Sequence, residues 1–113
     1  MIDLLIQTLQ PLGYPIRKQG SLNPNEAYPD TMFTYWNRGS YGDEFYDNDE
    51  NSTIWEFDLN VYSVDPDLVE SLLLDAKRLL KAQGFVASGK GHDIASDVEY
   101  QTGRGITVLK IEK

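Results

Sequence analysis

The chain has 113 residues, with 10 Lys and Arg against 18 Asp and Glu, which gives a formal net charge of −8. This acidic balance argues against a general nucleic-acid binder, because affinity for phosphate depends on a basic surface. The length fits one domain, and 41% apolar residues with 12% aromatics supply enough material for a hydrophobic core. The absence of cysteine excludes disulfides, thiolate nucleophiles and cysteine-bearing metal sites.

The sequence carries neither a membrane signal nor an export signal. Its first six residues, MIDLLI, lack the positively charged start and the small-residue cleavage site of a signal peptide. No apolar run approaches the ~18 residues that a membrane span needs. We therefore expect a soluble cytoplasmic product with no membrane partner.

The first elements are predicted to be a short helix, a brief strand and a loop. Apolar residues at helical spacing over 2–10 indicate an amphipathic helix, which Pro11 and Gly13 end. Residues 14–19 fit a brief strand. Residues 20–30 are rich in Gly, Pro, Asn and Ser, which is typical of a loop.

Two predicted strands flank a strongly acidic segment. Residues 31–37 are rich in aromatic and β-branched types, and residues 53–63 alternate between apolar and polar positions. The polar positions of this second strand would place one face of the sheet in water, which is typical of an antiparallel sheet. Residues 38–52 hold five acids against one base, Arg38, so half of the net charge lies there. We expect a long β-hairpin whose acidic tip, about 38–52, is flexible in the free protein.

The second helix has clear start and stop signals. Asp65 suits the N-cap, Pro66 the first helical position, and Asp67 the first turn. Basic residues near its C-terminal end and Gly84 after it mark the stop. Its apolar positions recur at three- and four-residue spacing, which predicts packing on the sheet. These positions are Leu68, Val69, Leu72, Leu73, Ala76, Leu79 and Leu80.

The last part of the chain is predicted to be strands broken by glycine turns. Residues 85–87 can start a strand, 89–93 break it, and 97–101 form a short extended piece. Residues 103–105 read as a turn before a terminal strand over 106–111. The predicted fold class is α+β, with residues 1–113 as a single domain. One mixed, mainly antiparallel sheet carries two helices, and the longer helix packs on one face.

A calcium loop is the strongest candidate for a metal site. Asp47, Asp49 and Asn51 match its first three ligands, but Ser52 stands where the loop needs Gly, and Asp58 stands where it needs a bidentate Glu. The strand pattern from residue 53 also conflicts with such a loop. We interpret the segment as a solvated hairpin tip and predict no metal and no cofactor.

The sequence offers little support for catalysis. His92, the single histidine, has no local partners for nucleophilic chemistry and is interpreted as a surface-loop residue. The glycine pairs at 89/91 and 103/105 are too short for a phosphate-binding loop. Paired carboxylates stay open, because sequence alone cannot pair 18 acids. A binding or assembly role is favoured over an enzyme.

Aromatic residues gather in the two central strands. Single-stranded nucleic-acid binders combine such rings with a basic groove, and this chain has the opposite net charge, so we predict no direct nucleic-acid binding. About half of the rings are needed for the core, and the others are suited to a protein interface. The residues concerned are Phe33, Tyr35, Trp36, Trp55, Phe57 and Tyr62.

The order of elements resembles a known family. The N-terminal helix, the acidic hairpin, the Asp-Pro-led helix and the terminal run DVEYQTGRGITVLKI (97–111) are together similar to small tail-terminator or head–tail joining (tail completion) proteins of long-tailed bacteriophages and prophages. The likeness spans roughly residues 1–112. Many members carry an aromatic residue after the Thr-Gly turn, where this chain has Arg104 and Gly105.

The resemblance implies a structural protein that forms a ring, usually a hexamer, and caps the tail tube. Its partners would be other copies of itself, the tail-tube proteins and the head connector. It would be found in the host bacterial cytoplasm during assembly and then in the virion. Our candidate interface comprises hairpin residues together with two arginines as partners on an adjacent subunit. These residues are Arg38, Asp43, Glu44, Phe45, Tyr46, Asp47, Asp49, Glu50 and Arg104.

Two other functions stay open at this point. An acidic inhibitor that mimics nucleic acid would display carboxylates over a rigid face in place of phosphates. Here the acids are concentrated in one hairpin, which disfavours that function. A small hydrolase with paired acids would need a deep pocket that holds two carboxylates beside an apolar wall.

Overall fold

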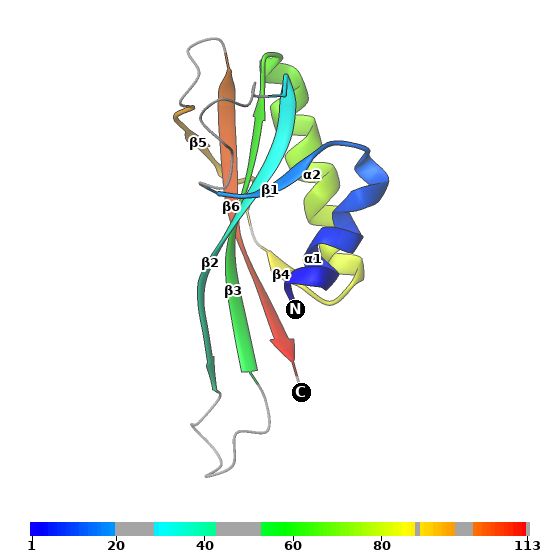
Figure 1. The fold of residues 1–113 in the computed structure, drawn as a ribbon, viewed down its shortest axis with the longest axis vertical. Coiled ribbons are helices and arrows are strands. Elements are labelled where there is room, and N and C mark those ends of the chain that lie inside the picture. The colour runs from blue at the N-terminus through cyan, green and yellow to red at the C-terminus, as the bar shows by residue number, and fades with distance from the viewer. Residues whose placement is uncertain (20–28, 43–52, 88, 97–100, 113) are drawn as a thin grey trace.

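A six-stranded mixed sheet carries two helices on one of its faces (Figure 1). The computed structural model describes residues 1–19, 29–42, 53–87, 89–96 and 101–112. The predicted α+β class is confirmed, and so is the packing of the longer helix on the sheet. No helix in the described part of the chain is long and apolar enough to cross a membrane.

The first helix ends where proline and glycine predict. Helix α1 spans Ile2–Leu9 and continues as one 3₁₀ turn, Gln10–Leu12. Gly13 follows with φ of 82°, a left-handed conformation that glycine adopts without a steric cost. Leu5 and Leu9 point into the core and are fully buried, so this short helix is an integral part of the packed body.

Helix α2, Pro66–Ala82, covers the centre of the sheet. The Asp65 side chain caps its start by accepting hydrogen bonds from the backbone N–H of Asp67 (3.0 Å) and of Leu68 (3.5 Å). Its apolar stripe enters the core at Val69, Leu72, Leu73, Ala76 and Leu80. Leu68 and Leu79 are only partly buried, which differs from the other five residues of this predicted stripe.

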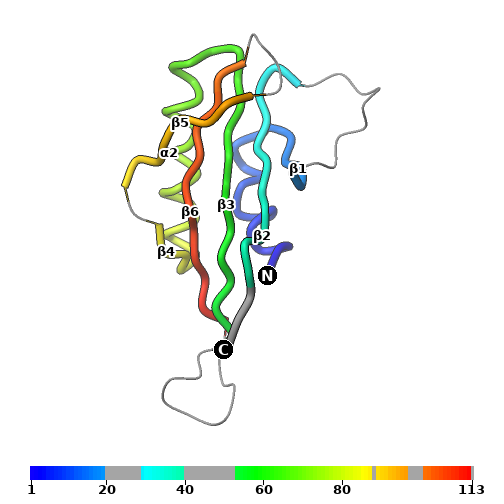
Figure 2. The backbone as a smooth tube through the Cα atoms, turned by 90° about the vertical axis from the view of Figure 1, so that its left-hand side faces the viewer, coloured from blue at the N-terminus to red at the C-terminus, as the bar shows by residue number. Residues whose placement is uncertain are grey.

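The strands are ordered β1-β2-β3-β6-β4, and β5 pairs with the same side of β6 as β4 (Figure 2). Strand β1 runs parallel to β2, and all other pairs are antiparallel. The strand bounds are β1 Ile16–Lys18, β2 Thr31–Gly42, β3 Thr53–Ser63, β4 Val86–Ala87, β5 His92–Ile94 and β6 Thr102–Glu112.

The two faces of the sheet differ as the alternation in residues 53–63 predicts. Phe57, Leu59 and Val61 are fully buried beneath the helices, together with Phe33 of β2. The Trp55 ring stacks on Phe57 with centroids 6.2 Å apart. The opposite face, which we call the helix-free face, carries the intervening residues of each strand. These include Trp36, Glu56, Asp58, Asn60, Tyr62 and Thr107.

Strand β2 is longer than the sequence predicts. The β2–β3 register shifts between Asn37 and Gly39, so Arg38 is the extra residue of a β-bulge. Pairing then continues to Gly42 opposite Thr53. Residues 38–42 are therefore strand, although we assigned them to the hairpin tip. The acidic segment 43–52 lies outside the described residues, so its predicted flexibility stays a prediction.

Of the two glycine-rich stretches predicted as turns, the second lies inside a strand and the first runs into one. Strand β5, His92–Ile94, begins inside the expected break at 89–93, and Gly103 and Gly105 lie inside β6. An added Cβ on Gly103 would come within 2.8 Å of the Tyr62 ring, and one on Gly105 would overlap Oδ1 of Asn60. These glycines make room for large side chains on β3, so the turn prediction is wrong. Of the extended piece predicted at 97–101, residues 97–100 lie outside the described residues.

Candidate functional site

Arg38 lies on the bulge of β2 and reaches across the helix-free face to β3. Its Nε is 3.8 Å from Oδ2 of Asp58, and the two side chains are 49% and 37% exposed. Asp58 also accepts a hydrogen bond from Oγ1 of Thr107 at 3.3 Å. The guanidinium is therefore held by its own chain and remains half open to a partner. The other candidate hairpin residues all lie outside the described residues, namely Asp43, Glu44, Phe45, Tyr46, Asp47, Asp49 and Glu50.

Arg104 lies far from the hairpin and fastens β5 to β6. Its Nη1 donates to Oδ1 of Asp93 at 2.8 Å, and its Nε donates to the carbonyl of Lys90 at 3.0 Å. A weaker bond from Nη2 reaches the carbonyl of Gly91 at 3.5 Å. The Arg104 side chain is only 22% exposed. It sits opposite Val61 on the helix-covered face, so the structure does not bring it together with Arg38.

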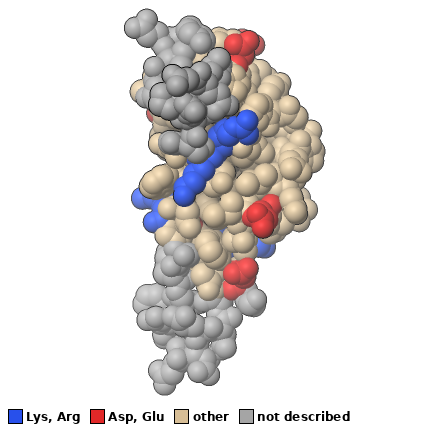
Figure 3. Space-filling model, in the orientation of Figure 1, with Lys and Arg blue, Asp and Glu red and all other residues tan. Residues whose placement is uncertain are grey.

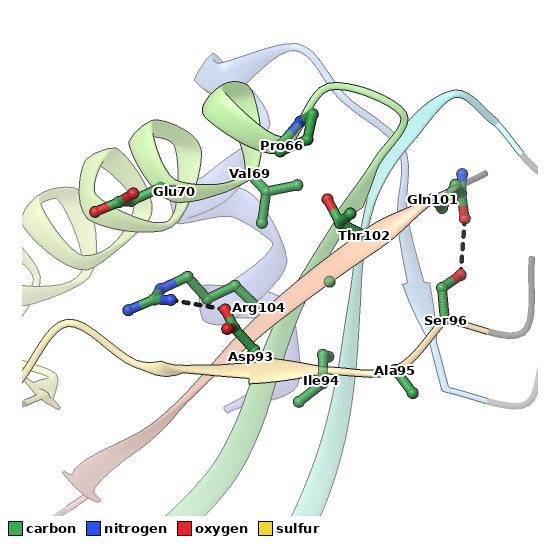
Figure 4. A pocket seen from close by; sticks show the side chains of 11 residues that line it. Pro66, Val69, Glu70, Asp93, Ile94, Ala95, Ser96, Gln101, Thr102 and Arg104 are labelled. Atoms are coloured by element: carbon green, nitrogen blue, oxygen red, sulfur yellow. Dashed lines mark hydrogen bonds and ion pairs between the residues drawn. The ribbon is translucent and has the colours of Figure 1, made fainter. Parts of the chain in front are cut away.

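A pocket of about 420 Å³ lies between the start of α2, β5 and β6 (Figure 4). Two carboxylates, of Glu70 and Asp93, line this pocket. In Figure 4 the Glu70 side chain points along the helix away from Asp93, and the Asp93 carboxylate is bound by Arg104. The pocket therefore lacks the converging acid pair that a hydrolase of the kind considered above needs.

A polar cluster occupies the centre of the helix-free face. Asn60 is 8% exposed and donates from Nδ2 to Oε1 of Gln19 (3.2 Å) and to Oγ1 of Thr34 (3.3 Å). A shallow pocket of about 300 Å³ beside it is lined by Asp58, Tyr62 and His92, among other residues. His92 is exposed, as the sequence predicts, but it lies in strand β5 and not in a loop. Each buried side-chain polar atom in the described part of the chain has a hydrogen-bond partner.

Exposed apolar side chains also gather on the helix-free face. Trp36 is 48% exposed, Val86 57% and Ile111 50%. Trp36 lies beside Asp58, Val86 beside Leu109, and Ile111 beside Ile54, so three successive rows of the sheet carry apolar groups. We call Trp36, Ile54, Val86, Leu109 and Ile111 the apolar strip. Strand alternation can place Trp36, Ile54, Leu109 and Ile111 on one face of their strands, whereas the position of Val86 depends on its pairing with β6.

The outer edge of β2 is open over its second half. Strand β1 pairs only with residues 33–35 of β2. In the described part of the chain no strand pairs with the outer backbone of residues 36–42. Such an edge presents free N–H and C=O groups to a strand of another molecule. The β1 end of this edge is basic, since Arg17 and Lys18 are exposed and Figure 3 shows a blue stripe over β1.

The described residues contain no group of three or more His, Asp or Glu that could hold a metal. Asp58, the residue in the last ligand position of the calcium-loop match, is engaged by Arg38 and Thr107. The remaining residues of that match, at 47–52, lie outside the described residues. No protein-family model matches this chain, and no curated protein matches it significantly.

Proposed function

We propose that this chain is a structural assembly protein of a phage or prophage tail that forms a ring capping the tail tube and joins it to the head connector. The observation that carries the proposal is the shape of the β2–β3 hairpin. In Figure 1 the lower ends of β2, β3 and β6 continue past both helices. The sheet thus has one part that the helices cover and a second part, which we call the arm, formed by the ends of β2, β3 and β6 beyond the helices.

The surface of the arm supports an assembly role. The apolar strip and the open edge of β2 both lie on the half of the sheet that extends toward the arm. Exposed Trp and aliphatic side chains in a row are typical of protein interfaces, and an open strand edge is a common pairing site. Among the described residues, the carboxylates of Glu70 and Asp93 diverge, which favours assembly over acid–base catalysis.

The alternative of an acidic inhibitor receives less support. A nucleic-acid mimic needs carboxylates spread over one rigid face without compensating cations. On the helix-free face Asp58 is paired with Arg38, and on the other face Asp93 is paired with Arg104. These two acids therefore each have a compensating cation, unlike the carboxylates of such a mimic.

Deletion of the gene from its native genome tests the proposal. The expected result is an accumulation of separate heads and of tails with irregular length, seen by electron microscopy, with normal particles restored by a plasmid copy. A plasmid copy that ends β2 and β3 in a short Gly-rich turn in place of 43–52 should fold but fail to restore particles. Normal particles after deletion would refute the proposal.

A further inference from the structure

The polar pocket on the helix-free face has no part in the proposed function. Its volume is about 300 Å³, and it lies between β3 and β5, with Asp58 and Asn60 lining it from β3 and His92 from β5. Asn60 and His92 both pair with residue 105 of β6, and this residue is glycine. No β6 side chain therefore separates them, which leaves a hollow in the sheet face between the two strands.

The side-chain amide of Asn60 is held so that its oxygen faces β6. Its Nδ2 donates to Oγ1 of Thr34 and to Oε1 of Gln19, on the other side of β3. Its Oδ1 lies so close to Gly105 that an added Cβ there would overlap it. No group in the described part of the chain donates to this oxygen, although Asn60 is only 8% exposed. Since no fully buried polar side-chain atom among the described residues lacks a partner, Oδ1 reaches solvent, and the pocket is the space beside it.

Asp58 supplies a second acceptor and the charge of the pocket. One carboxylate oxygen, Oδ1, accepts from Oγ1 of Thr107 at 3.3 Å. The other, Oδ2, lies 3.8 Å from Nε of Arg38, which is an ion pair but is too long for a hydrogen bond. Among the described residues that line the pocket, Asp58 is the only carboxylate, and none is Lys or Arg. The pocket therefore carries a negative charge and an oxygen with capacity to accept a hydrogen bond.

These acceptors favour a ligand that has several N–H donors and a positive charge. Residues 58 and 60 are alternate positions of one strand, so they lie about 6.5 Å apart along β3. A guanidinium is planar, always charged and carries five N–H donors, so it can donate to both residues at once. An ammonium is a compact point charge and reaches one of them at a time. The net charge of −8 also attracts cations to the chain.

We propose that this pocket binds a guanidinium group, either of a free small molecule or of an arginine side chain in a partner protein. The site goes beyond the assembly function and does not depend on it. Arg38 shows that Asp58 attracts a guanidinium, but this side chain is 49% exposed and its Nε forms no hydrogen bond with the carboxylate. A bound guanidinium would form the charge-assisted hydrogen bonds that Arg38 leaves unmade. Arg38 is then a competitor of the ligand.

NMR titration tests the site through the side-chain amide of Asn60 and the backbone amide of Gly105. The probe is N-acetylarginine amide, and its control is N-acetylcitrulline amide, which has a similar shape but no charge. The arginine compound should give saturable shifts at both groups. The citrulline compound should bind weaker by roughly fivefold or more, because it forms no charge-assisted hydrogen bond. N-acetyllysine amide should also bind more weakly, because its ammonium cannot reach both acceptors.

Free arginine distinguishes the two sources of the guanidinium. Its α-amino and α-carboxyl groups are charged, whereas the capped compound resembles an arginine residue within a protein. Tighter binding of free arginine than of the capped compound, by roughly tenfold or more, assigns the pocket to a small molecule. Equal binding of the two assigns it to an arginine side chain of a partner protein.

Substitutions on the same face separate this site from the general charge of the chain. Asp58→Asn should weaken binding of N-acetylarginine amide by roughly fivefold or more, since it removes the charge and keeps an acceptor for Thr107. The matched control, Glu56→Gln, removes the same charge two positions along β3, outside the pocket, and should bind like the wild type. Arg38→Gln should tighten binding by roughly twofold or more, because it removes the competitor. Circular dichroism melting checks that each variant is folded.

Three outcomes would overturn the inference. Shifts that fail to saturate mean that the pocket does not hold the group. Citrulline or lysine compounds that bind as tightly as the arginine compound mean that the pocket does not select a guanidinium. A folded Asp58→Asn variant that binds like the wild type, or an equal loss in Glu56→Gln, places the attraction elsewhere on the chain. None of these results touches the deletion phenotype, which judges the assembly function separately.

Discussion

Replacement of Gly105 by alanine should destabilise the fold, although alanine is normally the better residue inside a strand. Gly105 lies in β6 opposite Asn60, and its φ is not in the left-handed region. An added Cβ would overlap Oδ1 of Asn60. The Asn60 amide would have to move, and it would leave the hydrogen bonds that it donates to Gln19 and Thr34.

The size of the effect follows from these contacts. Two neutral hydrogen bonds contribute roughly 0.5–1.5 kcal/mol each, and Asn60 is too buried for water to replace them fully. Alanine in place of glycine returns about 0.4–1 kcal/mol by restricting the unfolded chain. The net loss for Gly105→Ala should be about 1–2 kcal/mol, a fall in melting temperature of roughly 4–8 °C for a domain of this length.

A double-mutant cycle with Asn60→Ala tests this reasoning by urea unfolding. In the Asn60→Ala background the overlap is gone, so Gly105→Ala should be neutral or stabilising by up to ~1 kcal/mol. The two substitutions should thus couple by about 1–3 kcal/mol. An equal cost of Gly105→Ala in both backgrounds, or a stabilised single variant, would show that Asn60 does not set the need for glycine.

Three further results are expected. Leu72→Ala should cost ~2–5 kcal/mol of unfolding free energy by thermal melting, whereas Leu79→Ala should cost ~1 kcal/mol, because Leu72 is 5% exposed and Leu79 is only partly buried; equal costs would contradict the packing described for α2. Arg104→Gln should lower stability by ~1 kcal/mol and speed amide hydrogen exchange in β5, while Asp93→Asn should cost under ~0.5 kcal/mol, since that carboxylate is 91% exposed; unchanged exchange in Arg104→Gln would contradict the fastening role. Neutralising two or three charges in residues 43–50 should leave the melting temperature almost unchanged and weaken association, and a collapse of that temperature would make the segment part of the fold.

Helices and strands whose apolar residues recur at regular spacing were predictable from the sequence. The alternation in residues 53–63 identified which side chains face the core, and Asp65 with Pro66 located the start of α2. In both cases the physical cause is local, because a strand or a helix repeats its exposure along its own sequence. The parallel pairing of β1 with β2 has no such local signal, since it depends on where α1 turns the chain.

The errors concern residues whose role depends on register. Gly103 and Gly105 read as turn formers in sequence, yet they lie in a strand because Tyr62 and Asn60 need the space above them. Only the β3–β6 register makes those pairs neighbours. The same register places Arg104 beside β5, which it fastens, and this position could not be derived from sequence. Its predicted role at an interface stays a prediction.

The bulge at Arg38 shifts the alternation of residues along β2 by one position. Before it, even-numbered residues of β2 share a face with Asn60, and beyond it Gly39 lies on that face, because Gly39 pairs with Glu56. Removal of Arg38 alone would leave Gly39 opposite Glu56 and keep the facing of the later positions of β2, and only the bend and the extra twist of the bulge would be lost. The direction in which β2 runs on toward Gly42 thus depends on a single residue, separately from the pairing that sets which side chains face the helices.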